Sequence, residues 1–294
     1  MKLKKALDYL KDLTFFLNYS YGKKIKNSKL SINIIIFSKD RACQLELLLR
    51  SMKKHWNGSF DHKIKVLYTY SNNEYKRGYD ILQTEYNDVL FKKEDEFKIS
   101  LLELIDKKEY TVFFVDDDIF KEDFSLKEKE MSIFKIKKEI ICLSLRLHPR
   151  LTYCYTLDIE MQKTNKNIWQ WGEYKGDYGY PMSLDGHIFR TKEIKNLLKN
   201  LHYYSPNTLE SVLSNNPINL PYLMCFDQSK IINNPCNLVQ SSHKNRHGNS
   251  DGETLNKKFI LGERIALDNI TGLDNISCHQ EIPIILNKIS LNTY

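Results

Sequence analysis

Three consecutive aspartates, Asp116, Asp117 and Asp118, directly follow the apolar run Tyr110–Val115. Adjacent carboxylates repel one another, so a cation is needed to neutralise them. Oxygen ligands of this kind suit Mg²⁺ or Mn²⁺, and both ions keep open positions that diphosphate oxygens can fill. The triplet therefore predicts a divalent-metal site that holds a diphosphate. The alternative is an acidic turn that caps a following helix.

The triplet ends one of several short apolar runs that read as buried strands. Strands are expected over residues 31–37, 64–70, 110–115, 140–145 and 184–189, and helices over 45–52, through 81–82, and over 97–105, 191–201 and 207–213. Apolar strands that alternate with helices predict a parallel sheet covered on both faces. Ligands bind beyond the carboxyl ends of such strands, which is where the triplet falls.

The composition narrows the class of protein. A chain of 294 residues that is 41% hydrophobic can bury a core, which excludes a wholly disordered protein. The formal charge of +7 permits an anionic partner, but it is spread along the chain. Six cysteines without a C-x-x-C pair, and no membrane-length apolar run, predict a cytoplasmic protein.

Apolar residues at helical spacing, from Leu3 to Leu17, predict an amphipathic helix at the amino terminus. Its apolar face is expected to pack on the domain. The alternative is a peripheral contact with the cytoplasmic face of a membrane.

Three segments together resemble a known family: Ser38–Arg41, Val115–Ile119 and Ser183–Arg190. They are similar in type and order to GT-A glycosyltransferases, especially the bacterial family-2-like enzymes. The resemblance covers about residues 30–240 and implies a Rossmann-like GT-A fold with a mostly parallel sheet. It divides the chain into an extension (1–29), a catalytic domain with donor (30–145) and acceptor (146–240) halves, and a possible lid (241–294).

By this resemblance, Asp118 and Asp116 ligate Mn²⁺ or Mg²⁺, and Asp116 and Asp117 lie beside a nucleotide sugar. A C-terminal histidine in some of these enzymes also ligates the metal, and His243 stands in the matching stretch. The other residues implied to bind the nucleotide sugar are Ser38, Lys39, Asp40, Arg41, Ser71, Asn72 and Lys98. Ser71 and Asn72 replace the family's usual carboxylate for the base, which leaves the nucleotide open.

The resemblance implies a general base at Glu210, which stands at the start of a predicted helix. Asn207 and Glu210 also have the spacing of a capping box, in which the glutamate would bond to the backbone instead. Asp185 is the other candidate, either as base or as a ligand of the acceptor. His187, close to Asp185 in the sequence, could equally be a ligand or a buried histidine at the end of a strand.

The implied activity is transfer of a sugar from a nucleotide diphosphate, with a UDP-sugar preferred, to a hydroxyl of a glycan or glycolipid. Inversion at the anomeric carbon and a role in bacterial surface polysaccharide or lipooligosaccharide synthesis are also implied. A metal-dependent phosphodiesterase or nuclease is the alternative, because clustered aspartates also build two-metal sites. A non-catalytic nucleic-acid-binding module leaves the triplet unexplained. No recognition motif is present, so no nucleic-acid partner is expected.

Overall fold

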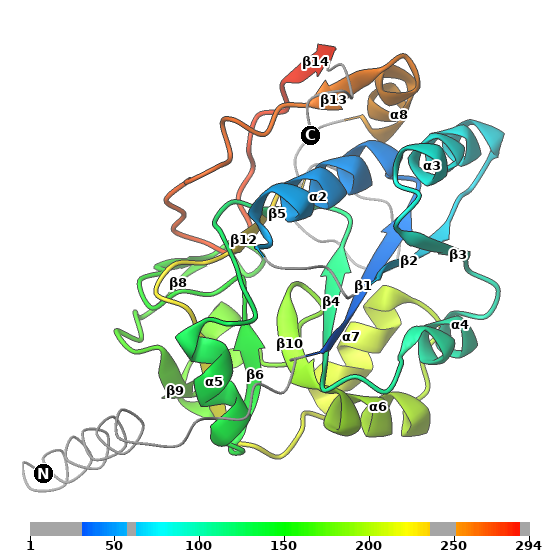
Figure 1. The fold of residues 1–294 in the computed structure, drawn as a ribbon. Coiled ribbons are helices and arrows are strands. Elements are labelled where there is room, and N and C mark those ends of the chain that lie inside the picture. Colours follow the sequence, from blue (N-terminus) through cyan, green and yellow to red (C-terminus); the bar gives the residue numbers. More distant parts are fainter. Residues whose placement is uncertain (1–30, 58–62, 236–250, 289–294) are drawn as a thin grey trace, which may run out of the picture. The chain divides into compact units, whose positions relative to one another are not determined.

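The computed structural model describes residues 31–57, 63–235 and 251–288, whose centre is a mixed sheet (Figure 1). Its strands, in spatial order, are β3 (Leu90–Lys93), β2 (Ile64–Thr69), β1 (Ile32–Lys39), β4 (Tyr110–Val115), β10 (His187–Arg190), β6 (Ile140–Ser144), β11 (Tyr222–Cys225) and β9 (Ile168–Gln170). Only β10 and β9 run antiparallel to their neighbours. The predicted α/β class with a mostly parallel sheet is confirmed.

Helices cover both faces of this sheet. They are α2 (Ala42–His55), α3 (Asn73–Glu85), α4 (Phe97–Leu104), α5 (Lys129–Ile136), α6 (Thr191–Asn200), α7 (Pro206–Asn215) and α8 (Gly252–Ile260). Successive side chains of a strand point to opposite faces. Ile35 and Phe37 of β1 therefore join a buried cluster with α4, α6 and α7. Helix α2 also contacts β1 but contributes no residue to this cluster.

The strand register brings three loops together at one edge of the sheet. In β1, Phe37 pairs with Val115 of β4 and Lys39 pairs with Thr69 of β2. All three strands are parallel, so their carboxyl ends lie side by side. The segments that follow them, beginning at Asp40, Tyr70 and Asp116, are neighbours for that reason.

Shorter elements surround the main sheet. A ribbon of β5 (Asp118–Phe120) and β12 (Ile231–Asn233) starts at the last aspartate of the triplet. The others are β7 (Tyr153–Cys154), β8 (Ile159–Glu160), β13 (Glu263–Ile265), β14 (Leu286–Lys288), and the 3₁₀ turns η1 (Trp171–Glu173) and η2 (Gly176–Gly179). Of the carboxy-terminal segment, α8 packs against α3 and α2, and β13 packs against α2.

Most of the predicted elements are confirmed, although several boundaries differ by up to three residues. The strand expected over 184–189 begins only at His187, because Gly186 has a φ of +67° and turns the chain there. A Cβ on Gly186 would lie 2.3 Å from the side chain of Ile231, so this turn also needs the absence of a side chain. The predicted amino-terminal helix lies outside the described residues.

Candidate active site

The aspartate triplet lies in a turn between two strands. It leaves β4 after Val115 and enters β5 at Asp118, so the alternative of a cap on a following helix is wrong. The backbone N–H of Val115 donates to Asp118 Oδ2 at 3.1 Å. The side-chain amide of Asn233, across the β5–β12 ribbon, donates to Asp117 Oδ1 at 2.9 Å and to Asp118 Oδ1 at 3.3 Å.

Arg41 supplies the positive charge that the triplet needs. Its Nη1 lies 3.0 Å from Asp116 Oδ1 and 2.8 Å from Asp117 Oδ2. The remaining oxygen, Asp116 Oδ2, accepts from the backbone N–H of Lys39 at 3.2 Å. Every carboxylate oxygen of the triplet therefore already has a protein donor.

Burial changes the acidity of the triplet. Burial raises the pKa of Asp116 to about 6 against the opposing charge of Arg41, with Asp117 raising it further. Burial also raises the pKa of Asp118 well above its usual value, and the charges of Asp185 and Asp117 add to the shift. Asn233, which contacts Asp118, pairs with His279, and His279 lies 3.3 Å from Asp185, so a second carboxylate group lies close to the triplet.

Metal binding at the triplet stays a prediction. Among the described residues, no group of three His, Cys, Asp or Glu side chains is arranged to hold a metal ion. An ion bound by Asp116 and Asp117 would have to displace Arg41 Nη1 from between them. His243, the predicted histidine ligand, lies outside the described residues.

The predicted nucleotide loops meet through Asp40. This residue has a φ of +58°, and its carboxylate accepts from the backbone N–H of Ser71 at 2.7 Å and from its hydroxyl at 2.5 Å. Ser38 bonds to the hydroxyl of Tyr79 at 2.8 Å on the other side of the same loop. The structure thus brings together both predicted loops and the triplet.

Two other predicted residues have different partners. Asn72 is the N-cap of α3, where its side chain accepts from the backbone N–H groups of Glu74 and Tyr75. Lys98 donates to the backbone carbonyls of Lys199 and Leu201 at the end of α6, at 2.9 and 2.7 Å. Lys98 is therefore not among the residues gathered around the triplet.

A second charged cluster forms around the buried Arg146. Its guanidinium lies 3.2 Å from Asp177 Oδ1 and 3.1 Å from Asp185 Oδ2. His279 Nε2, from the carboxy-terminal segment, lies 3.3 Å from the same Asp185 oxygen. Although burial alone would raise the pKa of Asp185, His279 and Arg146 hold it below its usual value. Asp185 is thus kept ionised.

Glu210 belongs to this second cluster and does not cap its helix. The N-cap of α7 is Ser205, which forms a capping box with Thr208, so the alternative that paired Asn207 with Glu210 is wrong. Glu210 Oε1 accepts from the backbone N–H of Leu184 at 3.2 Å.

Burial raises the pKa of Glu210 to about 7, with the charge of Asp185 adding to the shift and Arg146 opposing it. A carboxylate with that pKa is suited to general-base catalysis near neutral pH.

His187 is a buried structural side chain. Its Nδ1 lies 3.0 Å from the carbonyl oxygen of Pro181, and burial together with Arg146 lowers its pKa to about 3. Trp169 and Tyr178 are buried in the core.

Sequence reasoning missed Asn233, Arg146 and His279. Asn233 ends an apolar strand and His279 follows a buried cysteine, and neither position carries a recognisable motif. The contacts that bring them to the site come from the chain's tertiary path: the backbone N–H of Asn233 donates to the carbonyl of Cys278 at 3.0 Å.

Comparisons with known proteins identify the broader group. No family model matches the sequence. Over 236 residues the chain is 31% identical to the bifunctional glycosyltransferase pgtA of Dictyostelium discoideum, a match that covers 66% of this chain. The chain is related to glycosyltransferases. The predicted resemblance is thereby confirmed, and the alternatives of a nuclease and a nucleic-acid-binding module are not favoured. The chain spans about 30% of the length of this glycosyltransferase.

Solved structures show weaker similarity. The structure of S. aureus TarS 1–349 in complex with UDP has a TM-score of 0.48 and 11% identity, covering 69% of this chain and 60% of that one. The WbbM bifunctional glycosyltransferase has a TM-score of 0.32 and 13% identity, covering 66% and 38%. Both are too distant to inform the site. In the described part of this glycosyltransferase relative, no helix has the length and apolar character needed to cross a membrane.

Proposed function

We propose that this chain transfers a sugar from a nucleotide diphosphate, a UDP-sugar in the first instance, to a hydroxyl group of a glycan or glycolipid. The observation that carries the proposal is the proximity of two groups. A carboxylate triplet paired with Arg41 stands where strand-end loops converge, and Glu210, with a pKa of about 7, belongs to the neighbouring cluster. The similarity to pgtA supports the same class of reaction.

The two clusters divide the work of the reaction. The loops at Ser38–Arg41 and Ser71 would hold the nucleotide, with Lys39 and Arg41 supplying positive charge towards the diphosphate. The carboxylate of Glu210 would take the proton of the acceptor hydroxyl as its oxygen attacks the anomeric carbon. The bond from that carbon to the diphosphate oxygen then breaks, and the nucleoside diphosphate leaves with the bonding electrons.

This single displacement inverts the anomeric configuration. Asp185 stays ionised because of its partners, so it would accept a hydrogen bond from the acceptor and orient it. Binding of Mn²⁺ or Mg²⁺ at Asp116 and Asp118, with His243, stays a prediction. So do a peripheral membrane contact and a role in bacterial surface polysaccharide or lipooligosaccharide synthesis.

The proposal is tested by measuring release of nucleoside diphosphate. The protein is incubated with a panel of UDP-, GDP- and dTDP-sugars, with and without Mn²⁺ and with mixed glycan acceptors. Release of UDP that rises with added acceptor is expected. Absence of release from every donor under every condition, in a protein shown to be folded, would overturn the proposed activity.

A further inference from the structure

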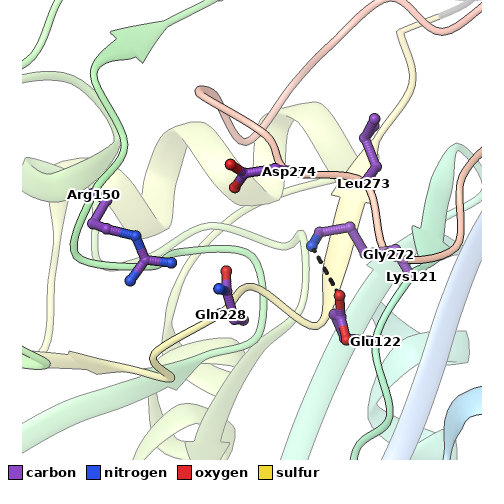
Figure 2. Close-up of a pocket in the computed structure, with 7 residues that line it drawn as sticks. All are labelled: Lys121, Glu122, Arg150, Gln228, Gly272, Leu273 and Asp274. Carbon is purple, nitrogen blue, oxygen red and sulfur yellow. Dashed lines mark ion pairs between the residues drawn. The ribbon is translucent and has the colours of Figure 1, made fainter.

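A polar pocket of about 380 Å³ lies beside the candidate active site. Its lining residues, shown as sticks in Figure 2, are Lys121, Glu122, Arg150, Gln228, Gly272, Leu273 and Asp274. The volume is at the lower end of the range found for small-molecule sites. No aromatic side chain lines the pocket, and charged and amide groups dominate it.

Lys121 is the unusual residue of this pocket. Its side chain is only 1% exposed, and its nearest carboxylate oxygen, on Glu122, is 3.9 Å away. Within the described part of the chain its ammonium group has no hydrogen bond to a side chain or carbonyl. Burial lowers the pKa of Lys121, and Glu122 and Asp274 only partly oppose this. A buried ammonium without a hydrogen-bond acceptor is destabilising unless a ligand supplies one.

Arg150 supplies a second cation on the opposite wall. Figure 2 shows its guanidinium and the Lys121 ammonium directed towards one another, with the amide of Gln228 between them in this view. In the described residues the guanidinium has no ion pair. Both cations and the amide of Gln228 line the same pocket.

The two acids of the pocket restrict the kind of anion. Glu122 and Asp274 line the same cavity, so a small free anion such as phosphate would be repelled as well as attracted. A ligand that combines an anionic group with several hydroxyl groups satisfies both kinds of side chain. Its anion pairs with Lys121 and Arg150, and its hydroxyls donate to Glu122 and Asp274. A sugar that carries a carboxylate has this combination.

Backbone segments connect the pocket to the candidate active site. Lys121 directly follows β5 and lies three residues beyond Asp118, which is about 10 Å in an extended chain. The backbone N–H of Lys121 donates to the carbonyl of Lys230, three residues before Asn233. The segment that contains Asp274 continues to His279, which contacts Asp185. Two segments that line the pocket therefore continue to residues of the candidate active site, Asn233 and His279.

We propose that this pocket binds a carboxylate-bearing sugar residue of the acceptor glycan, with Lys121 and Arg150 holding the carboxylate. The inference rests on the proposed glycosyl transfer for the identity of the ligand as an acceptor. The binding itself needs neither a donor nor turnover. It can therefore be tested separately from the transfer reaction.

The test is a binding titration followed by ligand-observed NMR with three probes: methyl β-glucuronide, methyl β-glucoside and sodium acetate. The wild-type protein is expected to bind the glucuronide at least about tenfold more tightly than the other two. Lys121→Met and Arg150→Gln should each weaken glucuronide binding about tenfold. Lys258→Met, which removes an exposed lysine of α8, should leave it unchanged.

Controls keep the outcome interpretable. Lys121→Met removes a poorly solvated charge, so its melting temperature should stay the same or rise while glucuronide binding falls. Arg150 is exposed, so Arg150→Gln should fold normally. UDP binding, measured by calorimetry on the same samples, reports on the donor site and is expected to be unchanged in both variants.

Three results would overturn the proposal. One is equal affinity for the glucuronide and the glucoside, and another is acetate binding as tight as that of the glucuronide. The third is glucuronide binding that neither Lys121→Met nor Arg150→Gln weakens. Failure of the wild-type protein to bind UDP would instead count against the proposed transferase activity. It would not affect the conclusion about the pocket.

Discussion

The two charged clusters of this molecule are built on the same plan from different kinds of sequence. In each, one arginine bridges two carboxylates: Arg41 joins Asp116 to Asp117, and Arg146 joins Asp177 to Asp185. The first cluster takes both acids from one strand end. The second draws on four separate parts of the chain, including Glu210 and His279.

The two clusters differ in the pKa values of their carboxyl groups. Around Arg41, burial raises the pKa of Asp116 to about 6. Around Arg146, Asp185 is held ionised while the pKa of Glu210 is raised to about 7. Environments that push two neighbouring carboxyl groups apart in this way are typical of acid–base sites. Proton transfer by the second cluster and donor binding by the first are the roles that we propose.

Replacing Glu210 should have the largest effect. Glu210→Gln is expected to reduce the rate of sugar transfer by about 10²–10⁴-fold, because the amide cannot accept the proton of the acceptor. UDP binding should remain within about twofold of the wild-type value. Glu139→Gln, at an exposed position, is the matched control and should be fully active. Near-normal turnover by Glu210→Gln would place the base elsewhere.

The two arginines should differ in their importance for stability. Arg146→Met leaves Asp177 and Asp185 buried without their cation, so a loss of about 3–5 kcal/mol in the free energy of unfolding is expected. Arg41→Met should cost less, because Asp116 already has a raised pKa and takes up a proton readily. Chemical denaturation of both variants measures the difference. Equal losses would contradict the contrast drawn between the clusters.

The pH dependence of transfer should report on Glu210. The base acts as its carboxylate, so kcat/KM is expected to fall about tenfold for each pH unit below about 7 and to level off above it. The stability effect has the opposite sign. A raised folded-state pKa stabilises the fold at low pH, and this contribution is lost as the pH rises from about 4.5 to about 7.

The contribution of Asp185 to stability should depend on pH in the opposite sense to that of Glu210. Its folded-state pKa is depressed, so its contribution to stability is present above its usual pKa and is lost as the pH falls. Denaturation of Glu210→Gln and Asp185→Asn across pH 3–8 separates the two. If both variants changed the pH profile of stability in the same sense, the assignment of an ionised Asp185 beside a titrating Glu210 would be incorrect.

A smaller effect is expected at the start of α7. Ser205→Ala removes the N-cap and should lower the free energy of unfolding by about 1 kcal/mol. Transfer activity at saturating substrate should stay close to that of the wild type, because Glu210 is held by Leu184 and not by the cap. A loss of activity as large as that of Glu210→Gln would show that the helix start positions the base after all.

Most of the first cluster was predictable from the sequence, whereas of the second cluster only Asp185 and Glu210 were. Asp116 and its neighbours follow an uninterrupted apolar strand, so both the strand and the site at its end are visible locally. The resemblance named the loops at Asp40 and Ser71, and the parallel strands bring them together because their carboxyl ends align. Fold class and most elements depend on this kind of local pattern.

Long-range packing decided the rest. Arg146 and His279 meet Asp185 across 39 and 94 residues, distances over which a single sequence gives no pairing signal. Glu210 was found through the resemblance to the glycosyltransferase family. That it does not cap α7 follows from Ser205 being the N-cap, and the sequence spacing alone did not favour Ser205 over Asn207 for that position. Lys98 was misleading because it lies in α4 and donates to backbone carbonyls at the end of the neighbouring α6.

Calorimetric titration with UDP most directly tests whether the first cluster is a nucleotide-diphosphate site. Wild-type protein and the Asp116→Asn and Arg41→Met variants are titrated with UDP and, as a control lacking the second phosphate, UMP, each with and without Mn²⁺. The wild type is expected to bind UDP at least tenfold more tightly than UMP, and both variants should lose most of this preference. Equal binding of UDP and UMP, or a preference that survives in both variants, would contradict the assignment.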